Sequence, residues 1–198
     1  MSNTAEPIDL APAAERLLTI VDGVRDEHLG GPTPCGSYPV SRLLAHLVGA
    51  ARAFRAAAEK DLGPWTDTSP DAAGWPELEP GWRDLLRERV TALVGAWRSH
   101  DAWQGMTRAG GVDLPGAAAG LVALDELVLH GWDLARATGQ AYDCDEATAR
   151  ALLGFVSQFD PAGTPGLFGP ALEVGEDAPV FDRVLARAGR DPEWAPRS

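Results

Sequence analysis

The sequence predicts an all-α protein, and three features point to that class. Apolar residues recur at intervals of three and four along several long segments, which is the spacing of one helix face. Short runs rich in proline and glycine separate these segments. No region is dense in the alternating polar and apolar pattern typical of a sheet. We therefore expect an all-α four-helix bundle with one or two additional C-terminal helices.

Local signals mark where several of the helices begin. Asp9 can cap the first helix, and Pro12 lies in its first turn. Pro39 opens the second helix, which runs to about Lys60, and Pro115 starts the fourth. The expected helical spans are 9–24, 39–60, 82–100, 115–139, 143–159 and 181–188.

Two connections between these helices are longer than a simple turn. The connection at 61–81 is rich in Pro, Gly, Asp and Trp, and we expect Trp65, Trp75 and Trp82 to pack it onto the bundle. A segment of this length inside a compact domain is often functional, so a substrate lid is the alternative. The segment at 101–116 is irregular or a short hairpin with its turn at Gly110-Gly111.

The whole chain sets limits on organisation and partners. We expect one domain over 1–198, with a Pro- and Gly-rich arm and a short helix at about 161–198. A formal net charge of −12 argues against nucleic acid and against an anionic membrane surface as partners. We see no signal peptide and no apolar run near the roughly 18 residues of a membrane span. Two cysteines make no disulfide framework, which favours a cytoplasmic location. The apolar helix faces are compatible with a monomer or a homodimer.

The helix expected at 115–139 carries the most informative polar residues. Glu126, His130 and Asp133 follow one another at offsets of four and three, which places them within an arc of about 60° on one helix face. Two ligand-type residues one turn apart can hold a single metal ion. Metal sites in helical bundles are built from side chains on facing helices, which gives a reason to pair this set with His46 on the second helix. The alternative for His46 is a histidine at a helix boundary that bonds a backbone carbonyl.

Two interpretations remain open for Asp133 and for two arginines, Arg42 and Arg108. Asp133 either accepts a ring N–H from His130 and fixes its tautomer, or is an exposed residue paired with Arg136 or Arg87. Arg42 and Arg108 either hold a substrate carboxylate or lie on the surface. Cys35 is expected to be a packed loop residue, since nothing cationic nearby in the sequence would make its thiol reactive.

Two stretches together resemble a known family. The first is TPCGSYPV at 33–40 leading into LLAHL at 43–47, and the second is DELVLHGWDLA at 125–135. They resemble the mycothiol-dependent maleylpyruvate isomerase metal-binding family, part of the DinB/YfiT-like four-helix superfamily. The segment at 105–116 is similar to an uncharacterised metal-binding subgroup of that family. Tyr38 and Arg42 stand where the family often has Trp and Asp.

The resemblance implies a site and a chemistry. It places the metal ligands on His46, Glu126 and His130, with mycothiol as a thiol cosubstrate. Two imidazoles and one carboxylate suit Zn²⁺ and leave one position open, and the same set can take Ni²⁺ or Fe²⁺. The family's isomerases carry an additional C-terminal α/β domain, which we do not expect here. The expected function is therefore a metal-dependent thiol S-transferase or isomerase that joins a small thiol to an electrophile. The alternatives are a non-catalytic metal-binding or regulatory module and a helical scaffold without metal.

Overall fold

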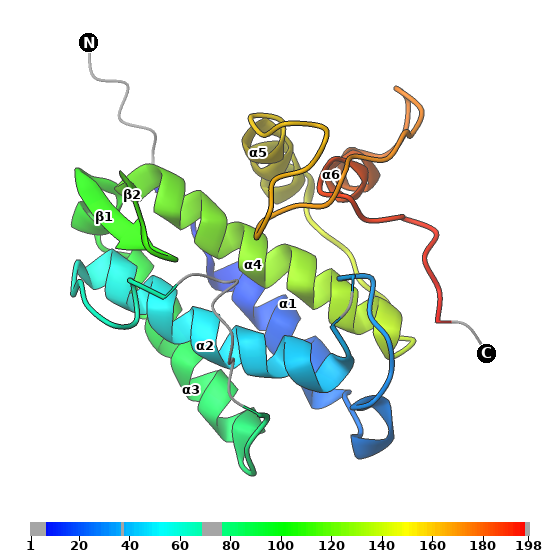
Figure 1. Ribbon diagram of the computed structural model, residues 1–198, viewed down its shortest axis with the longest axis horizontal. Helices are drawn as coiled ribbons and strands as arrows, with labels where there is room; N and C mark the ends of the chain where they lie inside the picture. Colours follow the sequence, from blue (N-terminus) through cyan, green and yellow to red (C-terminus); the bar gives the residue numbers. More distant parts are fainter. Residues whose placement is uncertain (1–6, 37, 69–76, 197–198) are drawn as a thin grey trace.

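The computed structural model describes residues 7–36, 38–68 and 77–196, and it confirms the all-α bundle (Figure 1). Helix α4 packs against α1 and α2, and α3 packs against α2 and α1, so the four main helices close around one apolar core. Helices α5 and α6 pack on each other, and α5 also contacts α4. The helices are α1 (Ala11–Asp22), α2 (Val40–Glu59), α3 (Trp82–Trp97), α4 (Gly116–Ala137), α5 (Glu146–Val156) and α6 (Val180–Arg187).

The segment between α3 and α4 was expected to be either irregular or a short hairpin, and it forms the hairpin. Strand β1 (Met106–Ala109) pairs antiparallel with β2 (Val112–Pro115). Gly110 and Gly111 make the turn with positive φ of 58° and 80°, a conformation that glycine adopts without steric cost. The Lys60 ammonium group, just after α2, donates to the backbone carbonyl of Gln104 at 2.7 Å. The hairpin is thereby fixed at the end of the bundle where α2 ends and α4 begins.

Most of the helix boundaries predicted from the sequence differ from those of the structure by one to three residues. Helix α1 begins at Ala11, and the Asp9 carboxylate accepts the Ala11 N–H at 3.0 Å. Helix α3 ends at Trp97, so His100 lies in a separate 3-10 helix at His100–Trp103. Helix α5 ends at Val156, three residues before the predicted end at Phe159.

The early end of α5 has a physical reason. The Phe159 ring packs edge-on against the Phe155 and Phe168 rings, at centroid distances of 5.1 Å and 5.0 Å. The Arg187 guanidinium donates to the Phe159 carbonyl at 2.7 Å, so this carbonyl has a partner outside any helix. The apolar spacing therefore correctly predicts that Phe159 packs against other apolar side chains, but it wrongly predicts that Phe159 is helical.

The tryptophans of the 61–81 connection behave differently from one another. Trp82 is buried in the core, as expected. Trp65 is 47% exposed, and its ring is covered on one face by the Arg52 guanidinium at 3.6 Å from the ring centroid. Trp65 therefore packs the segment onto the outer surface of α2 through a cation–π contact, and not into the core. Trp75 lies outside the described residues.

Gly120 lies where α4 packs closely against Trp103 in the segment before the hairpin, and substituting it should destabilise the protein. A Cβ at Gly120 would lie 2.5 Å from the Trp103 ring, which is itself buried. We expect Gly120→Ala to lower the free energy of unfolding by about 1–3 kcal/mol through overpacking. Gly95→Ala is the matched control, because this exposed glycine of α3 has nothing within 4 Å of a Cβ. That variant should gain roughly 0.5–1 kcal/mol. Urea unfolding of the two variants measures both effects, and two shifts of the same sign would contradict the close approach.

No helix within the described parts of the chain is long and apolar enough to cross a membrane.

Candidate metal centre

The contact between α2 and α4 brings His46 next to Glu126, eighty residues later in the sequence, and next to His130, one turn further along α4. The His46 Nε2 atom lies 2.8 Å from Glu126 Oε2, and the same oxygen lies 3.3 Å from His130 Nε2. The two imidazole rings are almost perpendicular, at 82°, with centroids 4.9 Å apart. His46 and His130 are only 7% and 8% exposed. Two ring nitrogens and one carboxylate oxygen therefore converge on one small, largely buried volume.

This geometry fits a divalent ion. The three ligand atoms all lie within 4.8 Å of one another. Two atoms that each bind one tetrahedral Zn²⁺ at about 2.0–2.1 Å lie about 3.3 Å apart, which is close to the separations from Glu126 to both rings. The nitrogen and oxygen donors suit Zn²⁺, Ni²⁺ and Fe²⁺ alike, so the donor set does not select among these metals.

The electrostatics of the centre keep Glu126 ionised. Burial alone would raise the pKa of this carboxyl group. The charges of His46 and His130 and their hydrogen bonds outweigh that cost, and the pKa of Glu126 falls below its usual range. Glu126 is therefore a carboxylate, the form that binds a cation, at any pH near neutrality.

Asp133 lies behind His130 and is fully buried. Its Oδ2 atom is 2.9 Å from His130 Nδ1. The interpretation of Asp133 as an exposed residue paired with Arg136 or Arg87 is therefore wrong, and Arg136 instead donates to the Trp194 carbonyl at 2.9 Å. A carboxylate acceptor at Nδ1 selects the tautomer that leaves Nε2 free of a proton on the side facing Glu126 and His46.

Arg190 completes this arrangement, and nothing in the sequence pointed to it. Its Nε donates to Asp133 Oδ1 at 3.0 Å and its Nη2 to Oδ2 at 2.9 Å, a two-pronged pairing of buried charges. Burial raises the pKa of the Asp133 carboxyl group, but the Arg190 charge and the His130 contact outweigh it and lower that pKa. The chain thus contains a row of contacts from Arg190 through Asp133 to His130 and Glu126.

The end of α6 determines where Arg190 points. Gly189 has φ of 78°, its N–H bonds the Ala186 carbonyl, and the Arg190 N–H bonds the Leu185 carbonyl at 2.8 Å. This pattern is a Schellman motif, which stops the helix and turns the chain sharply. A Cβ at position 189 would lie 2.8 Å from the Gly169 backbone, so only glycine fits there. The turn directs Arg190 into the interior. The only sequence signal for it is the Ala-Gly-Arg stretch at 188–190 that follows an amphipathic segment.

Asp125 is a second buried residue that the sequence analysis did not single out. It is 7% exposed, and its Oδ1 atom has no hydrogen-bond partner among the described residues. Burial raises the pKa of Asp125 to about 7, and the negative charge of Glu126 adds to that effect while Arg190 opposes it. Asp125 is therefore largely a neutral acid below neutral pH.

This raised pKa gives a testable pH dependence. The pKa of Asp125 is about 7 in the folded chain, and an unfolded aspartate has a pKa of about 3.9. Folding therefore costs free energy as pH rises from about 4 to about 7, and the cost is constant above that window. In metal-free protein, a shift of about three pKa units corresponds to about 4 kcal/mol, so we expect Asp125→Asn to gain on the order of 4 kcal/mol over wild type between those limits. Urea unfolding at several pH values measures the difference, and parallel curves for the two proteins would contradict it.

The two arginines suggested for substrate binding lie in different places. Arg42 is on α2 one turn before His46, exposed, with its guanidinium 4.6 Å from the centroid of the Tyr38 ring. The Tyr38 ring is in turn 6.2 Å from the His46 ring, so Arg42 borders the centre. Arg108 is on β1, where it pairs with Asp113 at 2.7 Å and Asp67 at 2.9 Å. The structure does not bring Arg108 to the centre.

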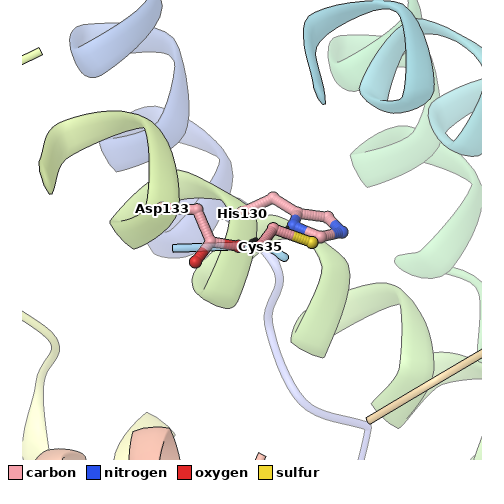
Figure 2. Close-up of side chains that lie close together, drawn as sticks. All are labelled: Cys35, His130 and Asp133. Atoms are coloured by element: carbon pink, nitrogen blue, oxygen red, sulfur yellow. Dashed lines mark hydrogen bonds and ion pairs between the residues drawn. The ribbon is translucent and has the colours of Figure 1, made fainter. Parts of the chain in front are cut away.

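Cys35 is partly buried and packs against the core, as expected for a packed loop residue. Its sulfur also lies within 4.8 Å of a ring nitrogen of His130 and a carboxylate oxygen of Asp133. Figure 2 shows the sulfur beside the imidazole, with Asp133 next to them. Both of these neighbours come from α4.

Two facing helices of a four-helix bundle thus carry the three side chains of the candidate centre. The family model for the mycothiol maleylpyruvate isomerase N-terminal domain matches residues 10–135. The chain belongs to this family, as the two sequence stretches indicated. Arg190 lies outside the matched part.

Two proteins of known sequence and two solved structures are similar to this chain. An uncharacterized protein of Mycobacterium tuberculosis strain H37Rv and its counterpart in strain CDC 1551 are each 30% identical over 190 residues, which cover 90% of this chain and 93% of theirs. A crystal structure of the mycothiol-dependent maleylpyruvate isomerase is similar with a TM-score of 0.57 at 21% identity. A histidine-to-alanine mutant of that enzyme gives a TM-score of 0.59 at 22% identity. The likeness covers 74% of this chain and 66% of the isomerase chains. These two structures therefore support the fold.

Proposed function

We propose that the chain binds one divalent metal ion, most readily Zn²⁺, through His46, Glu126 and His130. The observation that carries the proposal is the convergence of their Nε2, Oε2 and Nε2 atoms from α2 and α4. A closed structural zinc site usually has four protein ligands, whereas three leave one position for a small molecule. The described residues His46, Glu126 and His130 form the three-ligand set, and membership of a mycothiol-related family supports its use.

We further propose that the centre serves a thiol S-transferase-type enzyme whose small-molecule partners are mycothiol and an electrophile. A bound divalent metal would supply Lewis acidity that holds a thiol in its more nucleophilic deprotonated form. The protein's own contribution is positional. Glu126 stays ionised, Asp133 accepts the His130 Nδ1 proton, and Arg190 holds Asp133 in place. Arg42, beside the Tyr38 ring, is the nearer of the two arginines for an anionic substrate group. A reduced thiol partner agrees with a cytoplasmic location.

The test is metal-dependent turnover. Protein reconstituted with Zn²⁺, Ni²⁺ or Fe²⁺ should bind about one equivalent by elemental analysis. At least one form should accelerate the conjugation of mycothiol to monochlorobimane. If the protein binds metal but turns over none of several electrophiles, the proposed transferase activity is contradicted. If it binds no metal, the proposed metal centre is contradicted.

The alternative is a non-catalytic metal-binding or regulatory module, in which an ion held by His46, Glu126 and His130 fixes α2 against α4. In this alternative, chelation lowers the melting temperature strongly and no thiol is turned over.

A further inference from the structure

The inference concerns the C-terminal segment at 190–196, which follows α6 and contacts the last turns of α4 at two points. At its beginning, Arg190 donates to both oxygens of Asp133. Near its other end, the Arg136 Nε donates to the Trp194 carbonyl at 2.9 Å, and the Arg136 Nη2 donates to the same oxygen. Asp133 and Arg136 are about one turn apart on α4. The segment is therefore fastened twice to the helix that carries two of the three proposed metal ligands.

A compact turn joins these two contacts. The Trp194 N–H donates to the Asp191 carbonyl at 3.0 Å, and the Glu193 N–H donates to the Asp191 carboxylate at 2.9 Å. The Trp194 side chain is half-buried and packs against the edge of the core. Because the turn fixes the Trp194 carbonyl relative to Arg190, losing one contact with α4 weakens the other.

Little else holds the segment on the bundle. Of residues 190–196, all of which the structure describes, Arg190 alone is buried. None of them belongs to the buried apolar core, which is formed mainly by the four bundle helices. Segments with few buried apolar contacts open locally at a fraction of the free energy that global unfolding requires. We therefore expect this segment to leave α4 and return while the bundle stays folded.

Such an opening would change the surroundings of His130. In the closed state, Asp133 Oδ2 lies 2.9 Å from His130 Nδ1, and Arg190 holds this carboxylate in place. When the segment leaves, water reaches Asp133 and competes for the oxygen that contacts the imidazole. Loss of such a supporting partner costs a metal-ligating histidine about 10- to 100-fold in metal affinity. The open form is therefore expected to bind the metal more weakly than the closed form.

We propose that Arg136 is a positioning residue for the metal centre, because its contact with the Trp194 carbonyl, here called the latch, keeps the C-terminal segment closed. We propose also that closure and metal binding stabilise each other, a consequence that rests on the proposed function. The effect is reciprocal: if closure strengthens Zn²⁺ binding by some factor, bound Zn²⁺ favours closure by the same factor. Arg136 acts through the segment, since its guanidinium donates to Trp194.

The experiment is limited proteolysis of the full-length protein with trypsin, which must bind an arginine side chain in its own pocket before it cleaves. Cleavage after Arg190 therefore requires this side chain to leave Asp133. Its rate measures the population of the open segment when reclosing is faster than cleavage. Cleavage after Arg89, in the middle of α3, reports opening of the bundle instead. In metal-free wild type, cleavage after Arg190 should be at least roughly ten-fold faster than after Arg89.

Variants of Arg136 test the latch without metal. Arg136→Met should speed cleavage after Arg190 by roughly ten-fold, because hydrogen bonds from a charged donor are lost. Arg136→Lys keeps one cationic donor for the Trp194 carbonyl and should restore part of the protection. Arg83→Met is the matched control, since Arg83 on α3 also donates to a backbone carbonyl, that of Val24. It should change the rate by less than about a factor of two.

Zn²⁺ tests the coupling and separates it from the proposed function. Saturating Zn²⁺ should slow cleavage after Arg190 by about 10- to 100-fold, with a small peptide substrate as the control for trypsin itself. Equal metal-free rates after Arg190 and Arg89, or no effect of Arg136→Met, would overturn the latch. Bound Zn²⁺ that leaves cleavage after Arg190 unchanged, or speeds it, would overturn the coupling. If the protein binds no Zn²⁺ while Arg136→Met still opens the segment, the proposed function fails and the latch stands.

Discussion

Replacing His130 with alanine is expected to weaken the binding of Zn²⁺ by more than about 100-fold, because loss of a group that merely supports a ligand already costs about 10- to 100-fold. Nε2 of His130 lies 3.3 Å from Glu126 Oε2, so the imidazole is one of only three converging donors. His130→Ala would leave one imidazole and one carboxylate. Competition with a chromophoric chelator measures the affinity directly, and far-UV circular dichroism checks that the bundle remains folded.

The chain offers a matched control for this variant. His100 is an exposed histidine in the 3-10 helix after α3, and it belongs to no group of potential ligands within the described residues. His100→Ala should therefore leave Zn²⁺ affinity unchanged within a factor of two, as an order-of-magnitude expectation for an exposed residue. Equal affinities for His130→Ala and His100→Ala would show that the ion binds elsewhere.

Much of the fold could be predicted from the sequence because the bundle depends on local periodicity. An apolar stripe with a spacing of 3.6 residues identifies a helix without knowledge of its partner. The same periodicity predicted that Glu126 and His130 share one face of α4, because the geometry of a single helix determines their relative placement. It failed at Phe159, where burial comes from an aromatic cluster around a turn. Periodicity therefore reports which residues are buried more reliably than where a helix ends.

The parts of the candidate site that could not be predicted depend on long-range contacts of single side chains. Arg190 meets Asp133 across 57 residues of chain, and its segment has no periodic pattern to indicate burial. The fold also places Cys35 beside His130 and Asp133, which lie far from it in the sequence. Asp125 was not singled out from the sequence, and the packing of the bundle buries it. In each case a side chain acquires its surroundings from residues that only the tertiary structure supplies.

The His130 ring is therefore surrounded on several sides by groups with separate tasks. Glu126 and His46 lie at its Nε2, and Asp133 lies at its Nδ1. A ligand histidine held in this way has little freedom to rotate, which lowers the entropy lost when it binds an ion. Holding the ring in this way requires that two charged residues, Asp133 and Arg190, are buried. Each of these charges would destabilise the fold if the other were removed.

Breaking that pair should be the largest effect of any single substitution on stability. Arg190→Met keeps much of the side-chain volume but leaves the Asp133 carboxylate buried without its cation. We expect the free energy of unfolding to fall by about 3–5 kcal/mol, because an uncompensated buried charge is left in the interior. Urea unfolding of metal-free protein measures the loss. Arg150→Met is the matched control, since Arg150 pairs with Glu146 on the surface of α5 and should cost no more than about 0.5 kcal/mol.

A second substitution distinguishes stability from positioning. Asp133→Asn combined with Arg190→Met removes both buried charges, so the double variant should recover at least half of the stability that Arg190→Met alone loses. Its affinity for Zn²⁺ should nevertheless stay about 10- to 100-fold below that of wild type, because the neutral amide is a weaker acceptor for the His130 N–H. If stability and affinity instead recover together, Arg190 and Asp133 only hold the C-terminal segment in place. If affinity stays low while stability returns, the pair orients the ligand histidine, and the segment after α6 belongs functionally to the metal centre.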